Sequence, residues 1–157
     1  MLVIFSLSCS KGSVDPNSPD YFIATVDGKE INFDNDIKAQ INIPQQVSFS
    51  NPYVFWIEAN KVSGGGINLL HLTVESQLSI KSATYNNGIR PSDVWFLGVG
   101  GSPPSNQSIP TASKVNITFL SDTYAEGTFY GKVYPKGDVN NKKIIIKDGT
   151  FRVRYKK

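Results

Sequence analysis

The sequence is poor in cysteine and histidine, with one of each among its 157 residues, Cys9 and His71. A single cysteine permits no internal disulfide, so the hydrophobic core must stabilise the fold by itself. Zinc sites draw several ligands from cysteine, histidine and carboxylate side chains, and a Ser-His-Asp triad would have to use His71. We therefore predict no metal site and no cofactor, and we interpret His71 as a half-exposed strand residue on the face of Thr73 and Glu75.

Long apolar runs are also missing. Beyond the first residues, no segment approaches the roughly 18 apolar residues of a membrane-spanning helix. Residues 1–7 are almost entirely apolar, and Ser8, Cys9 and Ser10 follow them. Small residues before a cysteine at the end of an apolar segment resemble the signal of the bacterial lipoprotein pathway. This resemblance implies that residues 1–8 are the remnant of a signal peptide, with cleavage before Cys9 and acylation of its thiol and new amino group.

The segment after the cysteine is polar. Residues 10–20, SKGSVDPNSPD, include Gly12, Pro16 and Pro19, a composition typical of a flexible tether and not of a continuing strand. The alternative is an N-terminal strand with a small buried thiol. Each buried lipid methylene contributes about 0.8 kcal/mol, so several acyl chains hold a protein durably on a bilayer. We expect residues 9–20 to be a lipidated cysteine and tether, anchoring the protein to the bacterial cell envelope, at the outer membrane, without crossing it.

Helical spacing is absent as well, and period-two alternation dominates the chain. Residues 36–43, DIKAQINI, alternate cleanly, and Asp27-Gly28 between two strand-prone runs is a strong hairpin signal because both turn positions need positive φ. We expect strands at residues 21–26, 29–33, 36–43, 53–59, 68–75, 78–85, 93–99, 114–120, 126–134 and 142–155.

Nine to ten short strands separated by turn signals are typical of an all-β sandwich or barrel. Alternation gives most strands one wet face, which favours a single antiparallel β-sandwich domain over residues 21–157; a closed lipocalin-like barrel is the alternative. The strands around Trp56 and Trp95 are apolar on both faces, so we expect them to be central. Gly127 and Gly131 indicate a bulge, a bend or the close approach of another backbone.

Four short motifs resemble a family of small Bacteroidetes-type lipoproteins. They are ATVDGKEINF at 24–33, SATY at 82–85, AEGTFYGKVY at 125–134 and IKDGTFRVRY at 146–155. Members of that family begin the mature domain with a VDGK hairpin and end with paired GTF and GxF strands. The resemblance implies a β-sandwich on the cell envelope and transfers no catalytic residues.

Positive charge is concentrated near the C-terminus. Residues 142–157 hold seven basic residues and one acidic residue, Asp148, although the net charge is only +3. In TFRVRYKK the apolar Phe151 and Val153 alternate with Arg152 and Arg154, as a strand half in water requires. We interpret the stretch as a solvated strand and expect no nucleic-acid partner; contact with an anionic partner is the alternative.

Candidate carboxylate and calcium sites are weak. Glu58, Glu75 and Glu126 lie on expected strands, and two carboxylates suffice for glycoside hydrolysis. Residues 34–36, Asp-Asn-Asp, offer oxygen ligands but lack the spacing of a calcium loop. We interpret them as a polar turn and predict that the protein is not an enzyme.

Aromatic residues are the remaining signal. Exposed rings would give a ligand a flat apolar platform, and the candidates for ligand binding are Tyr130, Tyr134, Trp56 and Trp95; the tryptophans could instead fill the core. Thr128, Tyr130, Lys132 and Tyr134 are expected to share the outward face of their strand. The sequence therefore predicts a non-catalytic binding or accessory module of the cell envelope for a glycan or an envelope protein. The alternatives are a barrel binding a small apolar ligand and a carboxylate-dependent glycoside hydrolase.

Overall fold

The structure, a computed structural model, describes residues 17–44, 53–63, 66–86, 92–97, 107–108, 113–134 and 144–155. Cys9, the predicted signal remnant at 1–8 and most of the predicted tether lie outside these residues. The described part of the chain contains no helix long and apolar enough to cross a membrane. Its strands are β1 (Tyr21–Val26), β2 (Lys29–Asn32), β3 (Asn35–Pro44), β4 (Tyr53–Ser63), β5 (Gly66–Ser76), β6 (Ala83–Asn86), β7 (Ser92–Leu97), β8 (Gln107–Ser108), β9 (Lys114–Leu120), β10 (Tyr124–Tyr134) and β11 (Ile144–Arg154).

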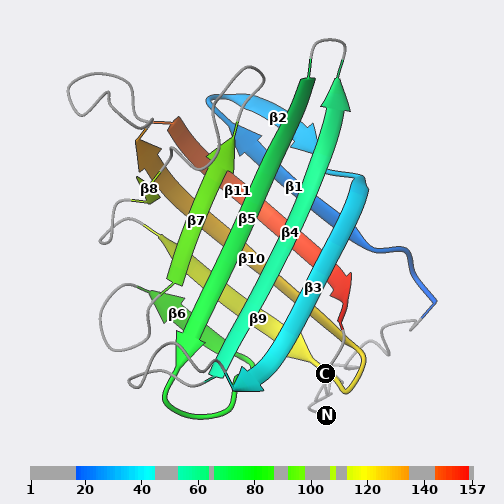
Figure 1. The fold of residues 1–157 in the computed structure, drawn as a ribbon, viewed down its shortest axis with the longest axis vertical. Coiled ribbons are helices and arrows are strands. Elements are labelled where there is room, and N and C mark those ends of the chain that lie inside the picture. Colours follow the sequence, from blue (N-terminus) through cyan, green and yellow to red (C-terminus); the bar gives the residue numbers. More distant parts are fainter. Residues whose placement is uncertain are drawn as a thin grey trace, which may run out of the picture.

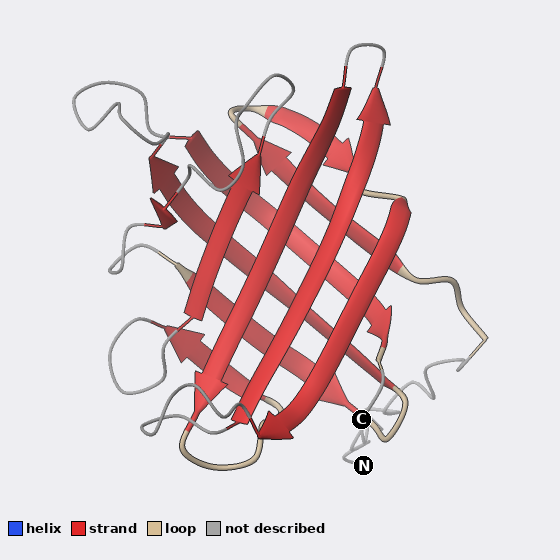
Figure 2. Cartoon of the chain, in the orientation of Figure 1, coloured by secondary structure: helices blue, strands red, loops and turns tan. Residues whose placement is uncertain are grey.

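These strands form two antiparallel sheets that face each other (Figure 1). The larger sheet has the order β2-β1-β11-β10-β9-β6, with β8 paired to β10, and the smaller has the order β3-β4-β5-β7. In Figure 2, every coloured element of regular secondary structure is a strand, and the strands of one sheet cross those of the other. The predicted all-β sandwich is confirmed, and the described strands do not close into a barrel.

The first hairpin has the predicted geometry. Asp27 and Gly28 have φ values of 48° and 83°, so both turn positions occupy the left-handed region that this turn requires. The turn also contacts β11, because the Asp27 side chain accepts a hydrogen bond from the Ile145 N–H at 2.8 Å. After β2, the Phe33 N–H donates to the Phe22 carbonyl at 2.8 Å, and the chain then passes to β3 in the smaller sheet.

The space between the sheets is filled by the apolar residues of the alternating pattern. Phe55, Ile57 and Ala59 of β4 are fully buried, whereas the residues between them are half-buried. Burying each large apolar side chain stabilises a fold by about 1.5–3 kcal/mol. Among the described residues, the largest fully buried side chains are Tyr85, Phe22, Phe33, Phe55, Phe151, Ile41, Ile57, Leu70, Leu72, Ile117, Ile146 and Val74.

Two Gly-Thr-Phe triplets, 127–129 and 149–151, pair with each other at the centre of the larger sheet. Gly127 is opposite Phe151 and Gly149 is opposite Phe129. A Cβ on Gly149 would lie 2.6 Å from atoms of the Phe129 ring, and a Cβ on Gly127 would meet the Phe151 ring and the Asn116 carbonyl. The predicted close approach at Gly127 is thus confirmed, and each glycine makes room for a phenylalanine ring of the neighbouring strand.

Three expectations were wrong. Among the described strands, the one around Trp95, β7, pairs with β5 alone and lies at the end of the smaller sheet, where its backbone approaches β8 and β10 of the larger sheet. Of the strand expected at 78–85, only β6 forms. Arg152 is 3% exposed instead of solvated, because it pairs with Glu126 and its guanidinium lies 4.4 Å from the centre of the Tyr124 ring.

We expect Gly149→Ala to lower the free energy of unfolding by about 1–3 kcal/mol, because overpacking a tight core has that cost. Equilibrium urea unfolding measures the loss. Thr150→Ala is the matched control, since the Thr150 side chain lies outside the core on the same strand. Equal stability of the two variants would contradict the Gly-Phe packing.

Candidate functional site

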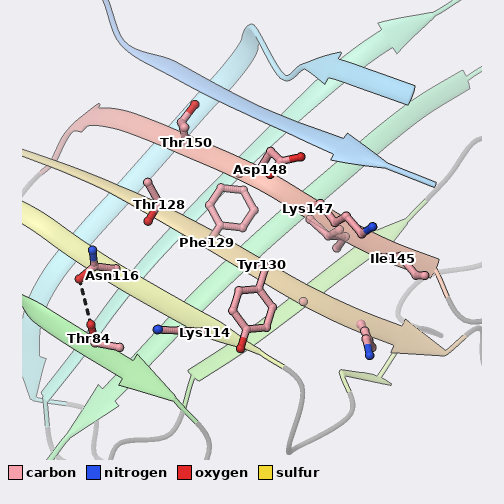
Figure 3. A pocket seen from close by; sticks show the side chains of 14 residues that line it. Thr84, Lys114, Asn116, Thr128, Phe129, Tyr130, Ile145, Lys147, Asp148 and Thr150 are labelled. Carbon is pink, nitrogen blue, oxygen red and sulfur yellow. Dashed lines mark hydrogen bonds between the residues drawn. The ribbon is translucent and has the colours of Figure 1, made fainter. Parts of the chain in front are cut away.

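The outer face of the larger sheet is hollowed over β6, β9, β10 and β11 (Figure 3). The hollow has a volume of about 730 Å³ and is open to solvent on one side. We call it the Tyr130 groove. It is lined by Lys132 and by the side chains of two adjacent cross-strand rows, Thr84-Asn116-Thr128-Thr150 and Lys114-Tyr130-Lys147-Asp148. The core residues Phe129, Ile146 and Gly149 contribute to its floor.

The first row is neutral and polar. Thr84, Asn116, Thr128 and Thr150 are successive cross-strand partners on β6, β9, β10 and β11. The Thr84 hydroxyl donates to the Asn116 side-chain carbonyl at 3.0 Å, as Figure 3 shows. Hydroxyl and amide groups both donate and accept hydrogen bonds, so the row presents mixed hydrogen-bonding capacity along the groove.

The second row carries an aromatic ring among charges. Tyr130 is opposite Lys114 of β9 on one side and faces Lys147 and Asp148 of β11 on the other. Its side chain is 46% exposed. The predicted outward orientation of Thr128, Tyr130 and Lys132 is confirmed, since all three are exposed and the residues between them are buried.

A β-bulge in β11 produces this row. Phe129 pairs with Gly149 and Gly131 pairs with Ile146, so Tyr130 alone faces two residues, Lys147 and Asp148. Asp148 has a φ of 49°, which aspartate adopts more readily than most residues. Both side chains are consequently exposed on the groove side. Bulges occur often beside functional sites, where they redirect side chains.

The groove has a surplus of positive charge. Lys114, Lys132 and Lys147 line it together with one acidic residue, Asp148, so three positive charges and one negative charge leave a formal +2. None of these lysines forms an ion pair with another residue in the described ranges. Their ammonium groups are available to an anionic ligand.

The other predicted aromatic residues do not join this groove. Trp56 is half-buried on the outer face of the smaller sheet, where its ring stacks on His71 at 6.1 Å and 11°. Trp95 is the backbone partner of His71 and Tyr134 that of Gln107, but the side chains of Trp95 and Tyr134 lie outside the described residues. Because Tyr130 and Trp56 lie on opposite faces of the sandwich, they cannot contact the same small ligand.

His71 makes the contacts of a strand residue, as predicted. Its side chain is 18% exposed, and its Nδ1 lies 3.6 Å from a Glu58 carboxylate oxygen. Its Nε2 lies 2.6 Å from the Thr73 hydroxyl on the same face.

The three candidate carboxylates are separated. Glu126 lies on the larger sheet and pairs with Arg152, whereas Glu58 and Glu75 lie on β4 and β5 of the smaller sheet. Glu58 is opposite His71 and Glu75 is opposite Val54, so their backbones are offset by four residues, or about 13 Å at the usual strand rise.

Residues 34–36, the weak calcium candidate that we interpret as a polar turn, make local ion pairs. Lys61 donates to both Asp34 oxygens at 2.7 and 2.9 Å, and this hydrogen bonding lowers the pKa of Asp34. Asp36 pairs with Lys38 at 2.6 Å. The described ranges contain no group of three or more histidine, cysteine, aspartate or glutamate side chains that could hold a metal ion.

Comparisons with protein-family models, curated proteins and solved structures found no match for this chain.

The bulge predicts that substitution by valine has different effects on stability at two adjacent exposed positions, Lys147 and Asp148. Asp148→Val should lower the free energy of unfolding by about 1–2 kcal/mol, because the left-handed conformation that aspartate tolerates is much costlier for a β-branched residue. Lys147→Val, with negative φ, should change it by less than about 0.5 kcal/mol. Chemical denaturation of both variants measures the difference, and equal losses would refute the assigned bulge.

Proposed function

We propose that the protein is a lipid-anchored, non-catalytic binding module of the bacterial cell envelope and that the Tyr130 groove binds a glycan. The observation that carries the proposal is an exposed tyrosine ring beside a row of hydroxyl and amide groups in one open groove. The apolar faces of sugars pack on aromatic rings, while sugar hydroxyls exchange hydrogen bonds with groups that both donate and accept. The groove offers both kinds of contact on adjacent strands.

The position of the predicted tether is compatible with this role. Asp20, its last residue, accepts hydrogen bonds from the Arg154 N–H and Nε–H, both at 3.2 Å. Asp148, in the groove, lies six residues before Arg154 on β11, which corresponds to about 20 Å of strand. The described chain thus enters the domain at the end of β11 away from Tyr130 and its neighbouring lysines, which is compatible with a site that stays accessible on an anchored protein.

The two alternative functions have less support. The first alternative, a closed barrel that binds an apolar ligand, is disfavoured because the described strands form two separate sheets packed around an apolar core. A two-carboxylate glycosidase would need two of Glu58, Glu75 and Glu126 on either side of one bond, and Glu126 lies on the opposite sheet from the other two. The same groove could instead take an envelope protein as its ligand. The glycan test below separates the two cases, because a protein-binding groove would bind no glycan.

Tyr130→Ala should weaken glycan binding about tenfold or more, because removing a ring contact worth about 1.4 kcal/mol has that effect. A glycan array identifies ligands of the wild-type domain, and calorimetry then measures affinities. Trp56→Ala is the matched control, since it removes a half-buried aromatic side chain from the other sheet. An unchanged affinity of Tyr130→Ala, binding lost only in Trp56→Ala, or no glycan bound by the wild type would refute the proposed site.

Cys9→Ser should move the protein from the membrane to the soluble fraction of the bacterial envelope, because the acyl chains would have no thiol to attach to. Fractionation followed by immunoblotting measures the distribution, and mass spectrometry of the wild-type N-terminus should find acylated Cys9. Ser10→Ala is the control. Membrane retention of Cys9→Ser, or an unmodified cysteine in the wild type, would contradict the anchor.

A further inference from the structure

The charge of the Tyr130 groove and the surface beside it limit the kind of glycan. We propose, on the basis of the proposed function, that the ligand is a linear acidic polysaccharide that lies along β10. One acidic sugar sits among the lysines at Tyr130, and neutral sugars continue toward Phe119. The inference depends on where the cations are, on where the next exposed ring is, and on what lies between them.

The cations surround one position. Lys114 is the cross-strand partner of Tyr130, Lys147 faces it from the bulge, and Lys132 lies two residues further on the same face of β10. An ammonium group on each side of an aromatic ring suits a sugar that stacks on the ring and carries a carboxylate or sulfate at its edge. Asp148 reduces the positive charge without cancelling it, and it can accept hydrogen bonds from sugar hydroxyls.

A second aromatic platform lies further along the same face. Phe119 is the cross-strand partner of Glu126 and is 38% exposed. One face of its ring stacks on Tyr124 at 5.1 Å and 20°, and Tyr124 is itself covered by the Arg152 guanidinium at 4.4 Å. The Phe119 ring is therefore supported by packing and keeps exposed surface for a ligand. Four residues of β10 separate Glu126 from Tyr130, or about 13 Å.

The surface between the two rings is neutral. Thr128 lies between Tyr130 and Glu126 on the outward face of β10, with Asn116 and Thr150 as its cross-strand partners. Glu126 would repel an anion, but its carboxylate pairs with Arg152. Of the cations described along this path, Lys114, Lys132 and Lys147 thus gather at the Tyr130 end, and Arg152 at the other end is paired with Glu126. A single-stranded nucleic acid carries a phosphate at every nucleotide and binds grooves that are positive along their length, so the charge distribution favours a glycan with separated acidic groups.

Two matched ligand pairs test the inference on the full chain. The probes are hyaluronan and its methyl ester, and unsulfated chondroitin and its methyl ester, each as octasaccharide and disaccharide, with single-stranded DNA as the competing polyanion; both acidic forms carry a carboxylate on every second sugar, and both esters are neutral. We expect the acidic octasaccharide of at least one pair to bind at least tenfold tighter than its neutral form, with an affinity that falls as salt is raised.

Lys132→Gln/Lys147→Gln should weaken that binding about tenfold, whereas Lys38→Gln/Lys61→Gln, which removes the same charge from the smaller sheet, should not. Phe119→Ala should lower the affinity for the octasaccharide several-fold and leave the affinity for the disaccharide unchanged, because a disaccharide bound at Tyr130 does not reach Phe119. Urea unfolding verifies that each variant is folded.

The results separate the two proposals. Neutral forms that bind as tightly as acidic forms, or equal effects of the two lysine pairs, would overturn the acidic ligand and leave the glycan site intact. Tighter binding of DNA than of any glycan, or no binding to any glycan, would overturn both. An unchanged octasaccharide affinity of Phe119→Ala would overturn the extended path along β10.

Discussion

The pairing of two Gly-Thr-Phe triplets at the centre of the larger sheet is the constraint on which the other features depend. Each phenylalanine ring occupies the space left by the glycine opposite, so Phe129 and Phe151 both reach the core from adjacent positions on neighbouring strands. Their ring centres lie 6.4 Å apart, and Phe55 of the smaller sheet lies 6.0 Å from Phe151. The interlocked rings therefore hold the register of β10 and β11 and join the two layers.

The candidate site follows from that register. Thr128 and Thr150, the middle residues of the two triplets, are cross-strand partners and point away from the core. Next to Gly149, the pairing register of β10 and β11 shifts by one residue. Lys147 and Asp148 therefore both face Tyr130. Without the bulge, only one of these two residues would share the face of Tyr130, because side chains alternate along a strand. Three consecutive residues of β11 thus serve both sides of the sheet: Gly149 makes room for the Phe129 ring in the core, and Lys147 and Asp148 line the groove on the surface.

Local patterns in the sequence predicted much of this. Alternation located most strands, Asp27-Gly28 located the first hairpin, and the position of Tyr130 between Gly127-Thr128-Phe129 and Gly131-Lys132 predicted its exposure. Properties that depend on partners from distant strands were not predicted. The burial of Arg152 depends on Glu126 and Tyr124 of β10, and the position of β7 at the end of its sheet depends on strand order.

The groove itself was missed for a related reason. Its side chains come from β6, β9, β10 and β11, so its shape appears only when the strand order is known. One local signal was present: an Asp-Gly pair inside a strand-like run, Lys147-Asp148-Gly149, indicates a bulge in the same way that Asp27-Gly28 indicates a turn. Trp56 and Tyr130 could likewise be assigned to separate surfaces only after their strands were assigned to different sheets.

The central claim is that a ligand occupies the outer face of the larger sheet at Tyr130. Its most direct test is a titration of the isotope-labelled protein with a bound glycan, followed residue by residue through backbone amide NMR shifts. The account predicts that the largest changes fall on Lys114, Asn116, Thr128, Tyr130 and the bulge residues Lys147 and Asp148. Changes concentrated around Trp56 and His71 on the smaller sheet would contradict it.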